Sequence, residues 1–85
     1  MNNTKNRIKT IEEITKEVEL SRWYAPSEIA QAQWIVNTKN KGDYWMILKL
    51  IRMDKLKSRN FGAGIVPYYM ISGEEILSFI KNRQG

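Results

Sequence analysis

The 85-residue sequence contains no cysteine and no histidine. Without cysteine the chain can form neither a disulfide nor a thiolate metal site, which is typical of a protein in a reducing cytoplasm. The lack of histidine removes the usual general base near neutral pH and the commonest metal ligand. The sequence also lacks a Gly-x-x-x-x-Gly-Lys phosphate-binding pattern, and its carboxylates lie on predicted exposed helix faces. We therefore expect a protein that is not an enzyme and that binds no cofactor or metal.

Long apolar runs are missing as well. No stretch approaches the ~20 residues of a membrane-spanning helix. Residues 1–9 are polar and basic, so we expect a flexible N-terminus and no signal peptide. Hydrophobic residues make up 42% of the chain, which is enough for one small domain with one core. The sequence therefore predicts a cytoplasmic globular protein without a membrane segment.

The net charge of +5 is concentrated in one part of the chain. Residues 37–59 contain seven basic and two acidic residues, whereas the remainder has seven of each. A single basic segment on an otherwise neutral chain is typical of a nucleic-acid-binding protein. The alternative is that these lysines and arginines only solvate a loop and an edge strand.

Residues 42–71 are predicted to form a helix, a basic turn and a hairpin. Asp43 is a suitable N-cap for a helix from Tyr44 to Met53, because its carboxylate can accept from backbone N–H groups of the first turn. Residues 57–61 are predicted as a basic strand, residues 62–64 as a glycine turn, and Pro67 limits where strand pairing resumes. On a helical wheel, the apolar side of the helix carries Met46, Ile47, Leu50 and Ile51, and the opposite side carries Trp45, Leu48, Lys49 and Arg52.

Two further helices are predicted before this region. Thr10 and Glu13 form a capping-box pattern for an amphipathic helix of about ten residues within residues 10–20. That helix either packs on the domain or pairs with a second copy of the chain. Ser27 is predicted to cap the next helix, which runs from Glu28 to about Asn37. The inward stripe of this second helix contains Ile29, Ala32, Ile35 and Val36, and Trp34 lies off the stripe, where it would serve domain packing or a partner contact.

The segment between the second helix and Asp43 is basic. We expect residues 37–42 to be flexible, and three interpretations remain open. The segment contacts the DNA backbone, it is a tolerated insertion, or the preceding helix boundary is misplaced. At the C-terminal end of the chain, Ser72 and Glu75 form a second capping-box pattern at the start of a last amphipathic helix.

Several motifs resemble a known family. Residues 51–57 (IRMDKLK) resemble the end of the recognition helix in the excisionase-like branch of the MerR-type winged helix-turn-helix proteins, and residues 60–71 (NFGAGIVPYYMI) resemble its wing. Residues 24–30 (YAPSEIA) and 72–80 are similar to its opening and closing helices. The resemblance implies an α+β, mostly helical fold: a winged helix-turn-helix domain over residues 21–85, with a two-stranded wing and an extra N-terminal helix. Asp54 stands where the family usually has glycine, and residues 37–42 lengthen a junction that is normally tight.

The resemblance and the charge pattern together predict a small DNA-binding protein, associated with the nucleoid, that acts in recombination directionality, transcription, or plasmid or phage maintenance. Its recognition helix would enter the major groove of double-stranded DNA with the wing alongside. The predicted DNA contacts are Lys39, Lys41, Trp45, Lys49, Arg52, Lys55, Lys57, Arg59 and Asn60.

A protein–protein interaction module of the same fold is the alternative function. A hairpin with one face on the core should show polar residues on its other face, but this wing is apolar on both faces near its tip. Its free face would then meet DNA, a protein partner, or a second copy in a homodimer or a cooperative array on DNA. The predicted interface residues are Leu48, Ile65, Val66, Tyr68 and Met70.

Overall fold

Helix α1 (Ile11–Glu17) begins with the capping box that the sequence predicts. The structure is a computed structural model that describes residues 8–62, 64 and 66–84. The Thr10 hydroxyl accepts from Glu13 N at 3.1 Å, and the Glu13 carboxylate accepts from Thr10 N at 2.8 Å. These bonds satisfy two backbone donors at the helix start. The helix is seven residues long, shorter than the expected ten.

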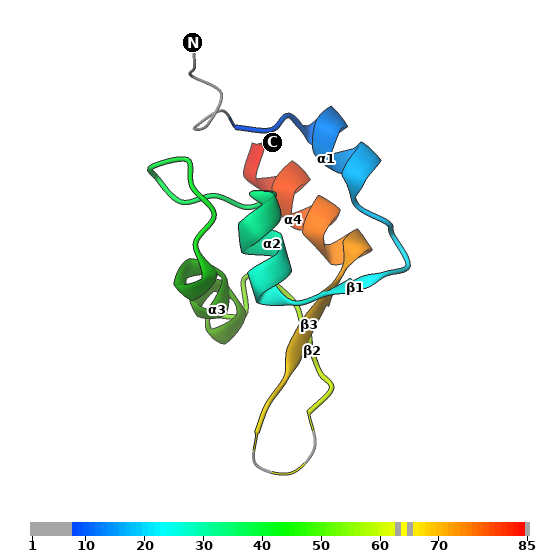
Figure 1. Cartoon of the computed structure of the whole chain (residues 1–85), viewed down its shortest axis with the longest axis vertical. Coiled ribbons are helices and arrows are strands. Elements are labelled where there is room, and N and C mark those ends of the chain that lie inside the picture. The colour runs from blue at the N-terminus through cyan, green and yellow to red at the C-terminus, as the bar shows by residue number, and fades with distance from the viewer. Residues whose placement is uncertain (1–7, 63, 65, 85) are drawn as a thin grey trace.

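Helix α1 packs against the C-terminal helix α4 (Gly73–Gln84), as Figure 1 shows. Ile14 of this helix and Val18, the residue that caps its C-terminal end, are buried in the domain core. Of the two alternatives for this helix, packing on the domain is therefore the one observed. The Lys9 ammonium and the Trp34 indole N–H each donate to the Glu17 carboxylate at 2.7 Å, and they lower its pKa from the ordinary value of 4.5.

Trp34 is a core residue. The sequence had left open whether this side chain packs in the domain or contacts a partner. Its ring packs edge-on against the buried ring of Tyr24, with 4.9 Å between the centroids. The indole N–H is satisfied by Glu17, so the ring is buried without leaving a polar group unpaired.

Helix α2 (Pro26–Ala32) begins earlier than predicted. The N-cap is Ala25, and the prediction that Ser27 caps the helix is wrong. Pro26 occupies the first helical position, where its missing N–H costs nothing. The Glu28 carboxylate takes over part of the capping role, because it accepts from Ala25 N at 2.8 Å.

Helix α2 also ends earlier than the predicted Asn37. Gln33 adopts the left-handed backbone conformation, with φ 58° and ψ 36°, and leads the chain out of the helix. Ile35 is buried although it lies beyond the end of the helix. The apolar pattern therefore predicted its burial correctly and its helical conformation wrongly. Of the three interpretations of residues 37–42, the misplaced helix boundary is confirmed, because α2 ends at Ala32. The contact with the DNA backbone stays a prediction.

The two strands of the predicted hairpin are present as an antiparallel pair, and a third strand, which the sequence did not predict, completes the sheet. Strand β3 (Tyr69–Ser72) lies in the middle, between β1 (Trp23–Tyr24) and β2 (Arg59–Asn60), and both pairings are antiparallel. The sequence shows an extended connector before Pro26, and in the structure this connector pairs with β3 as β1. Strand β2 covers only two residues of the predicted strand at 57–61.

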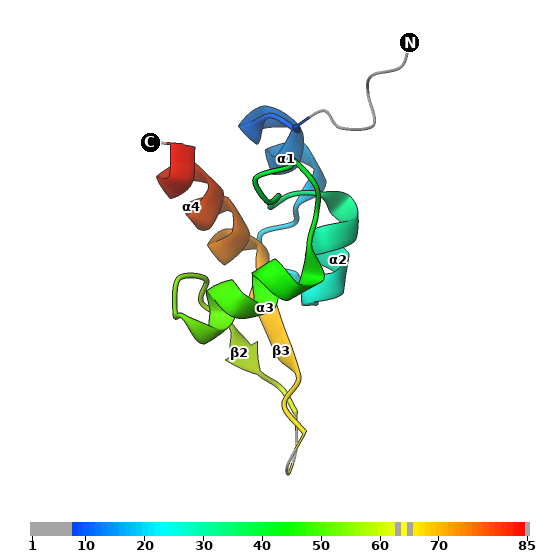
Figure 2. The same cartoon turned by 90° about the vertical axis from the view of Figure 1, so that its left-hand side faces the viewer.

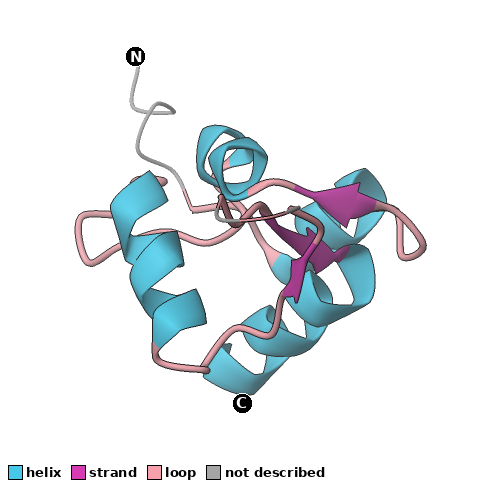
Figure 3. Cartoon of the chain, turned by 90° about the horizontal axis from the view of Figure 1, so that it is seen from below, coloured by secondary structure: helices cyan, strands magenta, loops and turns pink. Residues whose placement is uncertain are grey.

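One core unites these elements. Helix α3 (Tyr44–Arg52) crosses beside α2 and in front of β3, as Figure 2 shows. Viewed from the hairpin end, the helices lie around the short strands (Figure 3). Within the described residues, the chain is thus a small α+β globule with four helices and a three-stranded antiparallel sheet. The residues with the least exposed side chains are Ile29, Ile35, Ile47, Leu56, Ile71 and Ile76.

Candidate nucleic-acid interface

Helix α3 confirms the predicted cap, and the predicted division of faces holds except at Leu48, which is half-buried. Asp43 Oδ1 accepts from Trp45 N at 3.0 Å and from Met46 N at 3.3 Å. Ile47 is fully buried, while Trp45 is 73% exposed. Four residues at spacing i, i+3, i+4 and i+7 lie along the outer side of the helix. We call them the α3 ridge: Trp45, Leu48, Lys49 and Arg52.

The turn after α3 directs the chain into the hairpin. Asp54 has φ 62°, in the left-handed region that favours glycine, which is the residue that the resembled family usually has there. Two backbone N–H groups, those of Lys55 and Leu56, then donate to Leu50 O at 2.9 and 3.2 Å. Leu56 is buried, and it anchors the turn in the core. The exposed side chain of Lys55 lies just beyond the C-terminal end of α3.

Residues 37–42, predicted as a flexible linker, form a loop with internal hydrogen bonds. Asn37 organises it: the side-chain oxygen accepts from Lys39 N at 2.8 Å and Lys41 N at 3.2 Å, and Asn37 N donates to Lys41 O at 2.8 Å. An isolated bridge joins Val36 to Gly42. The lysine side chains are exposed on this loop, which leads into α3.

The hairpin of residues 59–72 projects away from the helices (Figure 1). Asn60 closes it, since its side-chain oxygen accepts from Gly62 N at 2.8 Å and from Tyr68 N at 2.9 Å. Val66 is 73% exposed and Tyr68 is 55% exposed, whereas Met70 is half-buried. The predicted interface residue Ile65 lies outside the described residues.

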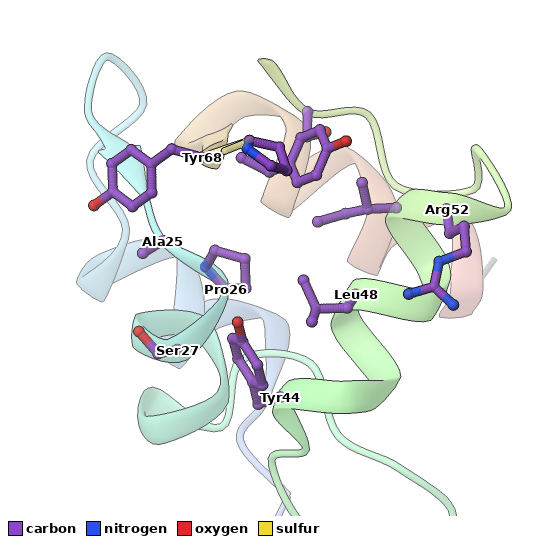
Figure 4. Close-up of a pocket in the computed structure, with 11 residues that line it drawn as sticks. Ala25, Pro26, Ser27, Tyr44, Leu48, Arg52 and Tyr68 are labelled. Carbon is purple, nitrogen blue, oxygen red and sulfur yellow. The ribbon is translucent and has the colours of Figure 1, made fainter. Parts of the chain in front are cut away.

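A groove of about 640 Å³ separates α3 from the hairpin, and the N-terminal end of α2 forms its third side. Figure 4 shows Leu48, Arg52 and Tyr44 along α3, facing Ala25–Ser27 and Tyr68. The fold therefore brings two predicted DNA-binding or interface positions of α3 together with one of the hairpin. The other lining residues are Ile51, Ser58, Pro67 and Tyr69.

Lys57 and Arg59 line a different depression, together with Glu74 and Glu75 at the start of α4. The Arg59 guanidinium lies over two aromatic rings, 5.9 Å from the centroid of Trp23 and 5.7 Å from that of Phe61. These two rings pack edge-on at 5.1 Å. The predicted DNA-binding residues thus fall into two groups, one on the α3 ridge and its adjoining loop and one behind the hairpin.

Sequence reasoning missed several side chains that line the groove. Tyr44 lies four residues before Leu48 on the same helix face, so the helical wheel could have found it. Its ring also packs against Trp45, with 5.3 Å between centroids. Ser58 and Tyr69 gave no such signal, because only strand pairing and the path of the turn bring them to the groove.

The described part of the chain contains no group of three or more histidine, cysteine, aspartate or glutamate side chains that would hold a metal ion. None of its described helices combines the length and hydropathy that crossing a bilayer requires. The chain matches no known protein family, no curated protein and no solved structure.

Proposed function

We propose that the chain is a small DNA-binding protein with a winged helix-turn-helix domain, in which α3 enters the major groove and the hairpin lies alongside as the wing. The observation that carries the proposal is the α3 ridge, whose side chains Trp45, Lys49 and Arg52 are exposed on a helix without an acidic residue. An α-helix with its side chains is about 10–12 Å in diameter. The major groove, ~12 Å wide, admits such a helix.

The distribution of charge supports the same orientation. Lys39 and Lys41 are exposed on the loop before α3, and Lys55 is exposed just after it. Cations at both ends of a helix that lies in the groove would meet the phosphates on either side. The resemblance of residues 51–57 and 60–71 to the excisionase-like family adds support, and it suggests a role in recombination directionality, transcription, or plasmid or phage maintenance.

Affinity for duplex DNA as a function of salt tests the proposal. If four to six basic side chains touch phosphates, log affinity should fall with log salt at a slope of about −3.5 to −5.5. Lys16→Ala is the matched control, because it removes one exposed positive charge from α1. This control should leave the affinity and slope nearly unchanged. Absence of binding to any duplex at low salt would refute the proposal.

Two substitutions separate base contacts from phosphate contacts. Arg52→Ala should weaken a preferred site by ~1–3 kcal/mol and relax base preference at one position, because arginine can bond two acceptors of guanine. Lys55→Ala, just beyond the C-terminal end of α3, should weaken all sequences alike and flatten the salt slope by roughly one unit. Equal behaviour of the two variants would contradict the placement of α3 in the groove.

A protein interface on the hairpin is the second candidate function, and the exposure of Val66 and Tyr68 favours it. Covering two or three apolar side chains at ~25 cal/mol per Å² contributes a few kcal/mol before association costs are subtracted. That is enough for a weak homodimer or for cooperative binding at adjacent DNA sites.

The double variant Val66→Lys, Tyr68→Lys tests this candidate. Because both side chains are exposed, the variant should melt like the original protein. Sedimentation should show weaker self-association, or DNA titrations should show weaker cooperativity between neighbouring sites. If self-association and cooperativity are both unchanged, the protein-interface candidate is wrong, and the hairpin contacts DNA.

A further inference from the structure

The α3 ridge has two chemically different halves. Its N-terminal half consists of Trp45 and Leu48, which are apolar, and its C-terminal half consists of Lys49 and Arg52. The packing of the Tyr44 ring against Trp45 widens the apolar half. Trp45 is 73% exposed, and Leu48 is half-buried where it lines the groove. An apolar surface of this kind, bordered by charge, is typical of a binding site. Its partner must offer apolar groups next to anionic ones.

The charges around the ridge restrict that partner further. Helix α3 contains no acidic residue. The carboxylate of Asp43 is turned onto the helix start, where Oδ1 accepts from Trp45 N and Met46 N. The major groove of DNA complements such a surface, because phosphates line its edges and the C5-methyl group of thymine is the apolar group on its floor.

We infer that Trp45 and Leu48 contact thymine methyl groups, and that Arg52 contacts a guanine or a phosphate further along the same groove. This inference rests on the proposed function and adds the class of DNA that is preferred. Seven residues of helix advance about 10 Å. That length corresponds to about three base-pair steps of 3.4 Å. The preferred site therefore has thymines under the start of α3 and the Arg52 contact at most about three base pairs away.

Replacing thymine with uracil removes only the methyl group, so it tests the inference directly. The probes are a short duplex of mixed sequence and the same duplex with uracil in place of every thymine, titrated at low salt by fluorescence anisotropy. Burial of one methyl group is worth about a fourfold change in affinity. We expect the thymine duplex to bind about 4- to 15-fold more tightly, for one or two methyl contacts.

Single variants assign the effect to residues of the ridge. Trp45→Ala and Leu48→Ala should each bring the thymine-to-uracil ratio closer to one. Lys49→Ala is the matched control from the cationic half: it should weaken binding to both duplexes and keep the ratio. Thermal melts establish that each variant is folded, and Trp45→Ala suffices if Leu48→Ala unfolds, because Trp45 is 73% exposed.

The outcomes distinguish this inference from the proposed function. If the original protein binds both duplexes equally, the methyl contacts are absent and the DNA-binding function stands. If neither duplex binds at low salt, both proposals are overturned. If the ratio persists in a folded Trp45→Ala, Leu48→Ala double variant, the preference comes from the DNA itself, and the inference is wrong.

Discussion

Gly42→Ala is expected to destabilise the protein, because the loop before α3 returns against α2 at this residue. A Cβ atom on residue 42 would lie 1.8 Å from Ala30 O and 2.7 Å from Ala30 C. Both are backbone atoms of a helix, so no change of side-chain rotamer relieves the overlap. Either the loop or α2 must move, and the bridge between Val36 and Gly42 would be distorted.

The size of the effect follows from this geometry. Inserting a group into packed structure costs typically ~1–3 kcal/mol, and an overlap with rigid backbone belongs at the upper end, about 3 kcal/mol. Domains of this size are stable by only about 5–15 kcal/mol. Each kcal/mol shifts the melting temperature by roughly 4–8 °C. We therefore expect Gly42→Ala to melt about 12–24 °C below the original protein.

Thermal melts and urea titrations measure the loss, with Gly64→Ala as the control. Gly64 has φ 72° and no atom within 4 Å of an added Cβ, so alanine there introduces backbone strain alone, about 1–2 kcal/mol. Gly42→Ala should be the less stable of the two variants. A Gly42→Ala protein that melts like the original, or above Gly64→Ala, would refute the close approach of the loop to α2.

Three other substitutions test local features. Gln33→Gly should raise the free energy of unfolding by up to about 1 kcal/mol, measured in urea, because the left-handed strain that glycine relieves, about 1–2 kcal/mol, exceeds the extra chain entropy that glycine loses on folding, about 0.5–1 kcal/mol. Asp43→Ala should lower it by about 1 kcal/mol through loss of the α3 cap, whereas Asp43→Asn, which keeps an acceptor, should change it little. The hydrogen bonds from Lys9 and Trp34 lower the pKa of Glu17. Their contribution to the free energy of unfolding is therefore complete above the ordinary pKa of 4.5, and it is lost as the pH falls through the lower pKa of the folded state. Glu17→Gln should therefore reduce stability near neutral pH by less than about 1 kcal/mol, since the pair is partly exposed, and should flatten the acid part of the stability–pH curve.

The central helix of the site was predictable from the sequence. Asp43 as a cap and the position of Ile47 on the inner face of α3 depend on neighbours within one or two helical turns, and the sequence displays those neighbours directly. The capping box at Thr10 and Glu13 is equally local. The same periodicity identified Trp45, Lys49 and Arg52 as outward-facing, so the α3 ridge needed no tertiary information.

The tertiary structure decided the rest. Strand β1 exists because β3 lies beside it, and no residue near Trp23 in the sequence specifies that partner. The left-handed conformation of Gln33, in a residue with no special preference for it, ends α2 while Ile35 continues into the core. Basic residues that are close together in the sequence separate, because Arg59 stacks on Trp23 and Phe61 while Arg52 lines the groove. Helix periods and caps are encoded in local sequence, whereas strand partners and the faces that side chains share depend on contacts between distant residues.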